Sequence, residues 1–361
     1  MRRALLLAAL VSAGCAQLQM KNPFDQAQKS IAAATGNKEC TRAELEKYAY
    51  SPDDEYWFGR SVADRLIAGF TQQNPDAVYP PDSPAAVYVN EVGQLAAEAA
   101  ERNRDDGGGP SGAARRFPGW ARVDDMPDRP PPEFGYRFIL VRNPAPGAWG
   151  LPGGFIILTD SLVARAGSED QLAGILAHEV AHVQRGHGIE VIKKVMCAQE
   201  DSAVKEVAKQ AGDTAASVKI VDLGPVVESL NKFADRLSDA LTDKGYGINY
   251  EYEADAYGTR YLATEGYSAA GIADFLHRVD ADPAFSTAMS KSHPPAHLRA
   301  EAIEKQVAAE KLEPARSPHE RERVSRFVKA MIAGGIRPDW SPKTDPATAP
   351  LVPPAKTASA N

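Results

Sequence analysis

The feature that most constrains this chain is the segment His178-Glu179-Val180-Ala181-His182, which has the pattern H-E-x-x-H. In an α-helix, residues four positions apart lie on the same face, so both imidazoles can point at one metal ion. Glu179 lies at the edge of that face, where its carboxylate can act as a base on a water molecule. Two imidazoles, a divalent zinc ion and a neighbouring carboxylate are the parts of a zinc hydrolase. The sequence therefore predicts His178 and His182 as zinc ligands and Glu179 as the catalytic base.

The residues around this motif predict a helix that begins after Ser168. Residues 168–171 (SEDQ) have the pattern of a capping box with acidic residues in the first turn. Apolar residues then recur at helical spacing, and Gly186 and Gly188 lie where such a helix would end. The alternative is a pair of surface histidines that flank a glutamate by chance, and the helical context disfavours it.

A third zinc ligand is expected in the segment 249–258 (NYEYEADAYG), because two imidazoles do not hold a catalytic zinc ion. Glu251 and Asp255 are four residues apart and share a helix face. Glu251 can complete a His-His-Glu ligand set. Asp255 can accept a hydrogen bond from the outer nitrogen of a ligand histidine and so fix its orientation. Glu253 lies on another face of this helix and is expected to be solvated.

Two further segments complete a resemblance to a known family. Residues 144–156 (PAPGAWGLPGGFI) resemble the pattern N-A-F-A-L-P-G-G-x-I, and residues 292–295 (SHPP) followed by Arg299 resemble H-P-P…R. Together with H-E-x-x-H and E-x-x-x-D, these segments resemble the CAAX-prenyl-protease-like family of zinc metallopeptidases, a branch of the gluzincins. The resemblance covers residues 55–310.

The resemblance implies an α+β, mainly helical, zincin-like domain with a small β-sheet beside the H-E-x-x-H helix and one Zn²⁺ per chain. In that family the histidine of H-P-P lies over the metal. His293 is therefore expected either to stabilise the developing oxyanion or to occupy the open metal position as a gate, and the alternative is a solvated loop histidine. Arg299 is expected to anchor this loop or to pair with an acid. The histidines expected at the surface, without a role, are His187, His277, His297 and His319.

Two apolar segments, 136–141 and 153–159, predict the strands of the small sheet. The segment 151–156, which contains the Gly-rich turn and the start of the second strand, is expected to be an exposed edge strand beside the metal, to which a peptide substrate adds through backbone hydrogen bonds. Its residues are Leu151, Pro152, Gly153, Gly154, Phe155 and Ile156. The alternative is a tight turn that serves only the fold. Gly147 and Gly150 replace the Asn and Ala of the family pattern, which leaves the substrate contacts of this segment open.

The N-terminus resembles a bacterial secretory signal, with a basic start and a short apolar run within residues 1–15. Residues 12–15 (SAGC) resemble a lipobox, although Ser12 stands where Leu is usual. This resemblance predicts Cys15 as a lipid anchor that holds the protein at the periplasmic face of the outer membrane, with plain secretion as the alternative. In such an oxidising compartment, Cys40 and Cys197 either form a disulfide or remain free thiols, since spacing alone does not decide.

The remaining sequence predicts how the chain is divided. The expected parts are a signal peptide (1–15), a tether (16–50), a zinc metallopeptidase domain (51–315) with a flexible loop (105–132) that is also a candidate lid, a C-terminal helix (316–335) and a disordered tail (336–361). Further helices are expected over 55–71, 84–102, 160–166, 189–222, 226–241, 268–279 with Ser268 as its cap, 296–311 and 318–334.

Composition excludes several classes of protein. The net charge is −7, and no basic patch with interleaved aromatic residues favours nucleic-acid binding. No apolar run after the N-terminus reaches the roughly 18 residues of a transmembrane helix. The predicted function is a zinc endopeptidase that cleaves misfolded envelope polypeptides, with outer-membrane assembly machinery as a candidate partner. The alternatives are a chaperone-like protein with a latent protease, and a metal-retaining scaffold without turnover.

Overall fold

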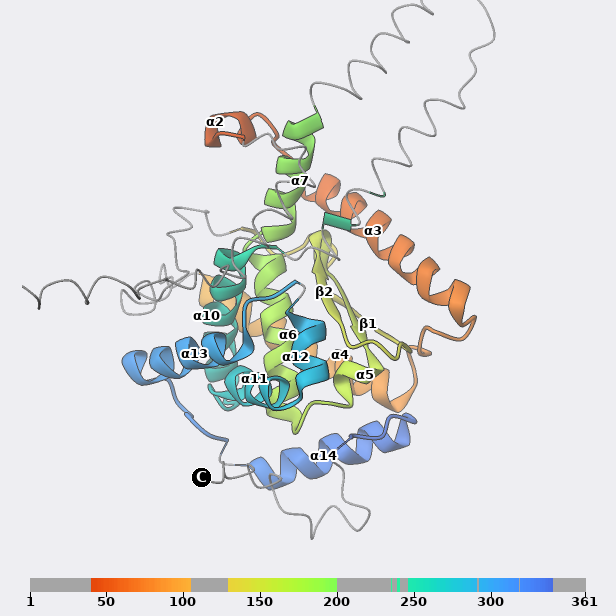
Figure 1. The fold of residues 1–361 in the computed structure, drawn as a ribbon, viewed down its shortest axis with the longest axis vertical. Coiled ribbons are helices and arrows are strands. Elements are labelled where there is room, and N and C mark those ends of the chain that lie inside the picture. Colours follow the sequence, from red (N-terminus) through yellow and green to blue (C-terminus); the bar gives the residue numbers. More distant parts are fainter. Residues whose placement is uncertain are drawn as a thin grey trace, which may run out of the picture.

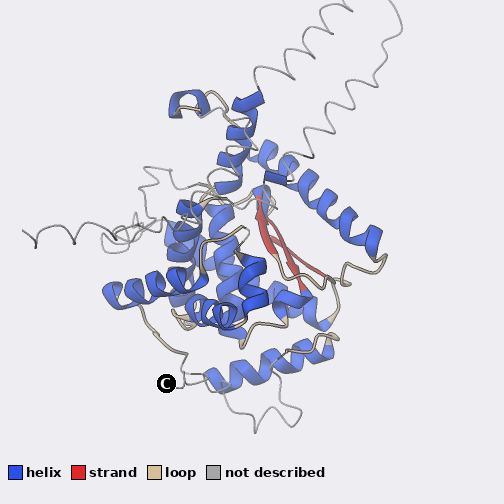
Figure 2. Cartoon of the chain, in the orientation of Figure 1, coloured by secondary structure: helices blue, strands red, loops and turns tan. Residues whose placement is uncertain are grey.

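The structure is a computed structural model, and it describes residues 40–104, 129–199, 235, 239–240, 246–290, 292–317 and 319–339. Cys15, residues 105–128 of the predicted loop, and nearly all of the predicted helix over 226–241 lie outside the described residues. The described residues form helices arranged around one small sheet (Figures 1 and 2). This arrangement confirms the predicted α+β, mainly helical fold.

The elements follow one another from the N-terminal helices through the sheet to a group of C-terminal helices. They are α2 (Arg42–Leu45), α3 (Pro52–Gln73), α4 (Pro84–Arg104), β1 (Arg137–Val141), β2 (Ala148–Leu151), η2 (Pro152–Gly154), β3 (Phe155–Thr159), α5 (Asp160–Val163), α6 (Glu169–Gln184), α7 (His187–Gln199), α10 (Ile248–Thr264), α11 (Gly271–Ala281), α12 (Pro283–Met289), α13 (Ala296–Glu310) and α14 (Glu320–Ala333). The strand β2 and the helix α12 were not predicted. In the part of the chain that the structure describes, no helix has the length and apolar character needed to cross a membrane.

The sheet has three strands in the order β1-β3-β2. Strand β3 is central, parallel to β1 and antiparallel to β2, and all of its residues are buried. The prediction that Leu151–Ile156 form an exposed edge strand is therefore wrong. Phe155 and Ile156 belong to the central strand, and residues 152–154 form a buried 3₁₀ turn, in which Gly153 has a φ of 68°. The edge of the sheet that is nearest to the predicted site is β2.

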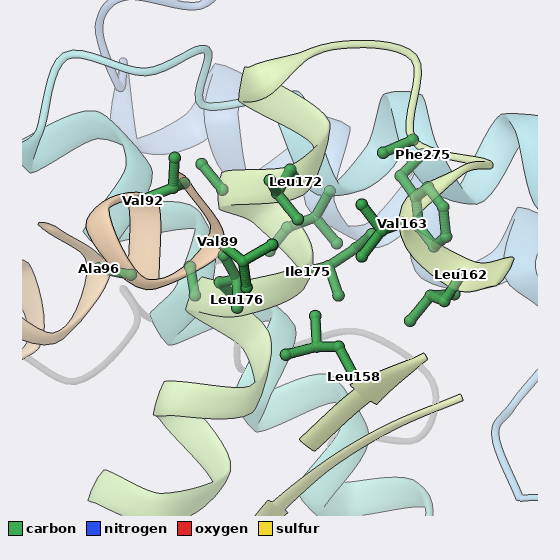
Figure 3. Packing of buried hydrophobic residues seen from close by; sticks show 14 of the residues in the cluster. Val89, Val92, Ala96, Leu158, Leu162, Val163, Leu172, Ile175, Leu176 and Phe275 are labelled. Carbon is green, nitrogen blue, oxygen red and sulfur yellow. The ribbon is translucent and has the colours of Figure 1, made fainter. Parts of the chain in front are cut away.

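Helix α6 lies at the centre of the molecule, with α10 on one side and the sheet on the other (Figure 1). Its buried residues Leu172, Ile175 and Leu176 form the middle of the main core (Figure 3). The core residues of α4, β3 and α5 around them include Val89, Val92, Ala96, Leu158 and Leu162. These apolar contacts hold α6 between a helical layer and the sheet, which fixes the position of the H-E-x-x-H residues.

Helix α10 packs closely against α6 because a glycine lies at the contact. A Cβ atom at Gly258 would lie 3.1 Å from the backbone nitrogen of His178. Helix α11 approaches the start of α6 in the same way, since a Cβ atom at Gly271 would lie 2.6 Å from the carbonyl oxygen of Asp170. Ser268, the predicted cap of α11, instead donates its N–H to Asp170 Oδ1 at 2.7 Å, and α11 begins after Ala270.

Helix α14 is attached to the N-terminal end of α6 by buried and half-buried ion pairs. Arg326 donates two hydrogen bonds to Glu169, at 2.6 and 2.5 Å, and Arg323 donates one to Asp170 at 2.8 Å. The residues that follow α14 also pack on the body. Ile336 is buried, and the N–H of Asp339 donates to the carbonyl of Ala164 at 3.0 Å. The prediction of a disordered tail from residue 336 onwards is therefore wrong for residues 336–339.

Cys40 and Cys197 form a disulfide, which answers the question that their spacing left open. The bond joins Cys40, two residues before α2, to Cys197 in α7 across 157 positions of sequence. Residues 40–50 were predicted as part of a tether, but they include this disulfide and the capped helix α2. The chain is thus attached to the folded domain from Cys40 onwards.

Replacing either disulfide cysteine by serine is expected to lower the free energy of unfolding by about 2–5 kcal/mol, because the bond closes a long loop in the unfolded chain. Denaturant unfolding of Cys40→Ser, Cys197→Ser and the double variant measures this loss. The three variants should be equally destabilised, since each lacks the same bond. A double variant as stable as the wild type, or no linked peptide in a non-reducing peptide map, would contradict the assignment.

Candidate metal centre and active site

The two histidines of the motif lie on the same buried face of α6. Ser168 caps this helix by accepting a hydrogen bond from the N–H of Gln171, and the apolar residues of the core hold the helix in place. The Nε2 atoms of His178 and His182 are 3.0 Å apart, and their side chains are 7% and 1% exposed. The helical spacing therefore brings both ring nitrogens to one point, as the sequence pattern requires.

Helix α10 adds Glu251 to the same point. Its Oε1 atom lies 3.5 Å from His182 Nε2, and its Oε2 atom lies 3.6 Å from His178 Nε2. The loop between α12 and α13 adds His293, whose Nε2 atom lies 3.4 Å from Glu251 Oε2. The ligand atoms of His178, Glu251 and His293 all lie within 4.8 Å of one another. Four predicted site residues from three parts of the chain are thus gathered around one small volume.

These donor atoms fit a tetrahedral zinc ion. Ligands bound at about 2.0–2.1 Å in a tetrahedron lie about 3.3 Å apart, and the donor atoms of His178, His182 and Glu251 lie 3.0 to 3.6 Å from one another. Glu251 Oε2 is buried and has no hydrogen-bond partner among the described residues. Arg299, His293 and His178 approach this oxygen only to 3.4–3.6 Å, so it has no hydrogen bond from these residues, and a bound cation would stabilise it. Imidazole nitrogens and one carboxylate are also the donor types that zinc prefers in catalytic sites.

Asp255 and Arg299 support His178 from behind. Asp255 Oδ1 lies 2.9 Å from His178 Nδ1, and both carboxylate oxygens accept hydrogen bonds of 2.7 Å from Arg299. Arg299 Nη1 also lies 3.5 Å from Glu251 Oε2. A hydrogen bond at Nδ1 leaves Nε2 free to bind a metal, and the two hydrogen bonds from Arg299 hold the Asp255 carboxylate beside His178.

Asp255→Asn is expected to weaken zinc binding by about 10–100-fold, because the amide no longer provides a carboxylate for His178 Nδ1. Competition with a chromogenic zinc chelator measures the change. Asp280→Asn is the matched control, since Asp280 also pairs with a histidine, His297, but at an exposed position. Equal affinity of the Asp255 variant and the wild type would contradict the supporting role.

The charges of the cluster favour a cation. Burial lowers the pKa of His178, but the hydrogen bond to Asp255 and the nearby Glu251 carboxylate outweigh burial and raise the pKa to about 9. Burial acts to raise the pKa of Glu251, yet the surrounding His293, His178 and Arg299 hold it well below its usual range. Burial, with His178 nearby, holds the pKa of His182 well below its usual value. The ionised carboxylates thus stabilise a proton on His178. A bound divalent ion would supply positive charge in place of that proton.

Glu179 is next to this cluster and is held by the sheet. Its carboxylate accepts a hydrogen bond from the N–H of Gly150 in β2, and its side chain is buried. A Cβ atom at position 150 would lie 2.4 Å from the carbonyl oxygen of Glu179, so the approach of β2 to α6 depends on glycine. Burial raises the pKa of Glu179 to about 7, which is suitable for a group that accepts and then returns a proton.

The cluster opens into a cavity of about 120 Å³ whose remaining wall is mainly apolar. Apolar side chains from α5, α6, α11 and α12 form much of this wall, namely Leu162, Ile175, Ile272, Phe275, Leu276 and Met289. Tyr246 lies on the other side, stacked on the His182 ring with centroids 4.3 Å apart, and its hydroxyl donates to the carbonyl of Gly150 at 2.5 Å. No sequence pattern had indicated Tyr246.

Two predictions about residues near the site are wrong. His187 was expected at the surface, but it is fully buried, with its Nδ1 atom 2.8 Å from Nδ1 of His182. Glu253 was expected to be solvated, but it is 3% exposed and accepts a hydrogen bond from Arg185 at 2.8 Å. The other histidines without a predicted role, His277, His297 and His319, are exposed as expected.

Comparison with known protein families agrees with this geometry. The profile of Peptidase family M48 matches residues 119–307, which is more than half of the 361 residues. The chain belongs to peptidase family M48. Family M48 peptidases depend on a metal ion, and the match contains the H-E-x-x-H helix, Glu251 and His293. This M48 chain is therefore a metalloprotease, as the sequence predicted.

Three curated relatives carry protease names. The M48 chain is 27% identical over 144 residues to the putative beta-barrel assembly-enhancing protease of Vibrio cholerae, a match that covers 40% of this chain and 28% of the relative. It is 25% identical over 165 residues to metalloprotease YcaL of Escherichia coli, with coverages of 45% and 59%. It is 35% identical over 60 residues to mitochondrial metalloendopeptidase OMA1 of Schizosaccharomyces pombe, with coverages of 17% and 18%. Each match spans less than two thirds of the relative's own length.

Proposed function

We propose that this M48 chain is a zinc-dependent endopeptidase of the bacterial cell envelope whose resting state is latched by His293. The observation that carries the proposal is the convergence of four donor residues beside the buried carboxylate of Glu179, at the end of an apolar cavity. The family assignment supports peptide-bond hydrolysis at this place.

In this proposal His178, His182 and Glu251 hold the zinc ion. When bound, zinc polarises the peptide carbonyl and makes water more acidic. Glu179 accepts a proton from the attacking water and then gives it to the leaving amine. The hydrogen bond from the N–H of Gly150 keeps the Glu179 carboxylate beside the cluster through both transfers.

His293 completes the donor set and thereby blocks it. Its Nε2 atom lies 3.4 Å from Glu251 Oε2, close to the 3.5 and 3.6 Å that separate Glu251 from His182 and His178. The hydroxyl of Ser292 lies 2.8 Å from His293 Nδ1 and holds the ring in this orientation. A catalytic zinc site needs an open position for water or substrate, so His293 must leave before cleavage.

Strand β2 offers an edge for a peptide. Gly150 directs its N–H to Glu179 and its C=O to Tyr246, so this edge of β2 faces the active site rather than β3. Backbone groups two residues apart face the same way in a strand. The N–H and C=O of Ala148 therefore point in the same direction as those of Gly150, towards the cavity that Ala148 lines. We infer that a substrate adds to β2 here, and that the apolar wall receives an apolar side chain beside the cleaved bond.

The envelope location and substrates are inferred from the N-terminus and the relatives. The signal-like residues 1–15 with Cys15 predict export and a lipid anchor at the outer membrane. One relative is named as a beta-barrel assembly-enhancing protease, which supports unfolded outer-membrane polypeptides as the substrate class, with their assembly machinery as a partner.

Removal of the metal is expected to abolish cleavage of labelled casein, because Glu179 alone does not polarise a peptide carbonyl. The measurement uses the purified chain and its His293→Ala variant, each treated with a zinc chelator, dialysed and then supplied with one equivalent of Zn²⁺. Cleavage should disappear on chelation and return with zinc. Cleavage that persists in the metal-free protein would contradict the proposed function.

A further inference from the structure

His187 is the first residue of α7, and a sharp turn brings it back against the metal cluster. Arg185 ends α6, and Gly186 has a φ of 68°, so the chain changes direction between the two helices. On a continuous helix, a residue five positions after His182 would point away from it. Here the two Nδ1 atoms lie 2.8 Å apart, and the rings meet edge to face with centroids 4.9 Å apart.

The contact between these two nitrogens assigns a tautomer to each ring. A hydrogen bond at 2.8 Å requires that one Nδ1 carries a proton and that the other accepts it. When a neutral His182 binds a metal through Nε2, its proton lies on Nδ1, so His182 donates and His187 accepts. The proton of a neutral His187 then lies on Nε2.

Two residues of α10, Glu253 and Tyr250, face the His187 ring. His187 Nε2 faces Glu253 Oε2 at 3.5 Å, and neither atom has a hydrogen-bond partner among the described residues. Arg185 Nε donates to the other oxygen of Glu253 at 2.8 Å, and the ring of Tyr250 stacks on His187 with centroids 4.6 Å apart. The His187 ring is therefore held by the stacked ring of Tyr250 and by the carboxylate of Glu253, which Arg185 holds in turn.

Both histidines of the motif thus have a partner at Nδ1. Asp255 lies behind His178, and His187 lies behind His182. We propose that His187 is a positioning residue, which fixes the tautomer and ring orientation of His182 and is held in turn by Glu253. This inference rests on the proposed function, because it requires His182 to bind zinc through Nε2. The support from a neutral ring acceptor differs from that of Asp255, since it adds no charge to the metal site.

The test compares the zinc affinity of the full chain carrying His187→Asn, His187→Gln or His187→Leu, by chelator competition with Zn²⁺ alone. The side-chain oxygen of Asn reaches the position of His Nδ1, whereas the amide of Gln reaches that of Nε2. His187→Leu and His187→Gln should weaken zinc binding by about 10–100-fold, and His187→Asn should retain most of the affinity. His277→Asn makes the same change at an exposed histidine that pairs with Glu304, and it serves as the control with unchanged affinity.

Each outcome decides between a positioning and a merely structural role. If His187→Leu does not fold, the comparison of His187→Asn with His187→Gln still tests the positioning role, because these two variants differ only in how far the side-chain amide extends. Asn and Gln variants of equal affinity, or a Leu variant that binds zinc as the wild type does, would overturn the inference. A wild-type chain that binds no zinc would overturn the proposed function and this inference together.

Discussion

Glu179→Gln is expected to reduce casein cleavage by about 10²–10⁴-fold while the chain keeps its fold and its zinc. The amide has the shape of the carboxylate and can still accept the hydrogen bond from Gly150, so packing in the buried site is preserved. It does not accept a proton from water, so the step in which the nucleophile is activated is lost. The measurement is cleavage of labelled casein together with zinc content on the same sample.

Glu304→Gln is the matched control for this variant. Glu304 is an exposed glutamate that pairs with the exposed His277, so the same chemical change there should leave cleavage unchanged. A Glu179→Gln chain that still cleaves casein at the wild-type rate would contradict the assignment of Glu179 as the base. Loss of zinc from this variant would instead assign Glu179 to the metal.

His293→Ala is expected to increase casein cleavage by about 10–100-fold. A resting chain in which His293 fills the fourth position is competent only in the minor fraction of molecules where the loop has opened. If that fraction is about 1–10%, removing the imidazole makes most molecules competent and raises the rate by the inverse of the fraction. Zinc should remain bound, since His178, His182 and Glu251 are intact.

Two neighbouring changes separate this effect from others. His297→Ala removes an exposed histidine a few residues away and should not alter cleavage. Ser292→Ala removes only the hydroxyl that holds the His293 ring, so it should give a smaller increase. A loss of cleavage in His293→Ala, with zinc retained, would assign the histidine to the oxyanion and would contradict the latch.

The sequence predicted the positions of the charged cluster well, because helical spacing determines them. His178 with His182, and Glu251 with Asp255, are pairs four residues apart, so each pair had to share a face once its helix formed. The pairing of the two helices, and the approach of His293 and Arg299, came from the family resemblance and not from spacing. Their roles as ligands and supports remain predictions that the variants above test.

The sheet shows where sequence patterns are insufficient. Strand β2 has only four residues, two of which are alanine and glycine, so it has no alternation that would predict a strand. Without β2, the apolar segment at Phe155 and Ile156 resembles an edge. Once β2 is present, that segment is the central strand, and β2 is the edge of the sheet beside the site.

His187 was expected at the surface because no pattern assigned it a role, and Glu253 because it lies on another face of its helix than Glu251. Five residues separate His187 from His182, which on one helix predicts opposite directions. The left-handed conformation of Gly186 ends that helix and reverses the expectation. A buried Glu253 follows from the buried His187, since each provides part of the polar environment that the other needs.

The most direct test of the zinc-peptidase assignment compares two purified chains, the His293→Ala variant and the His293→Ala, Glu179→Gln double variant. Zinc content and casein cleavage are measured on each. The account predicts about one zinc per chain in both, as for a site with a single His-His-Glu set, and cleavage only where Glu179 is present. Cleavage without zinc, or zinc with equal cleavage in the two chains, would contradict it.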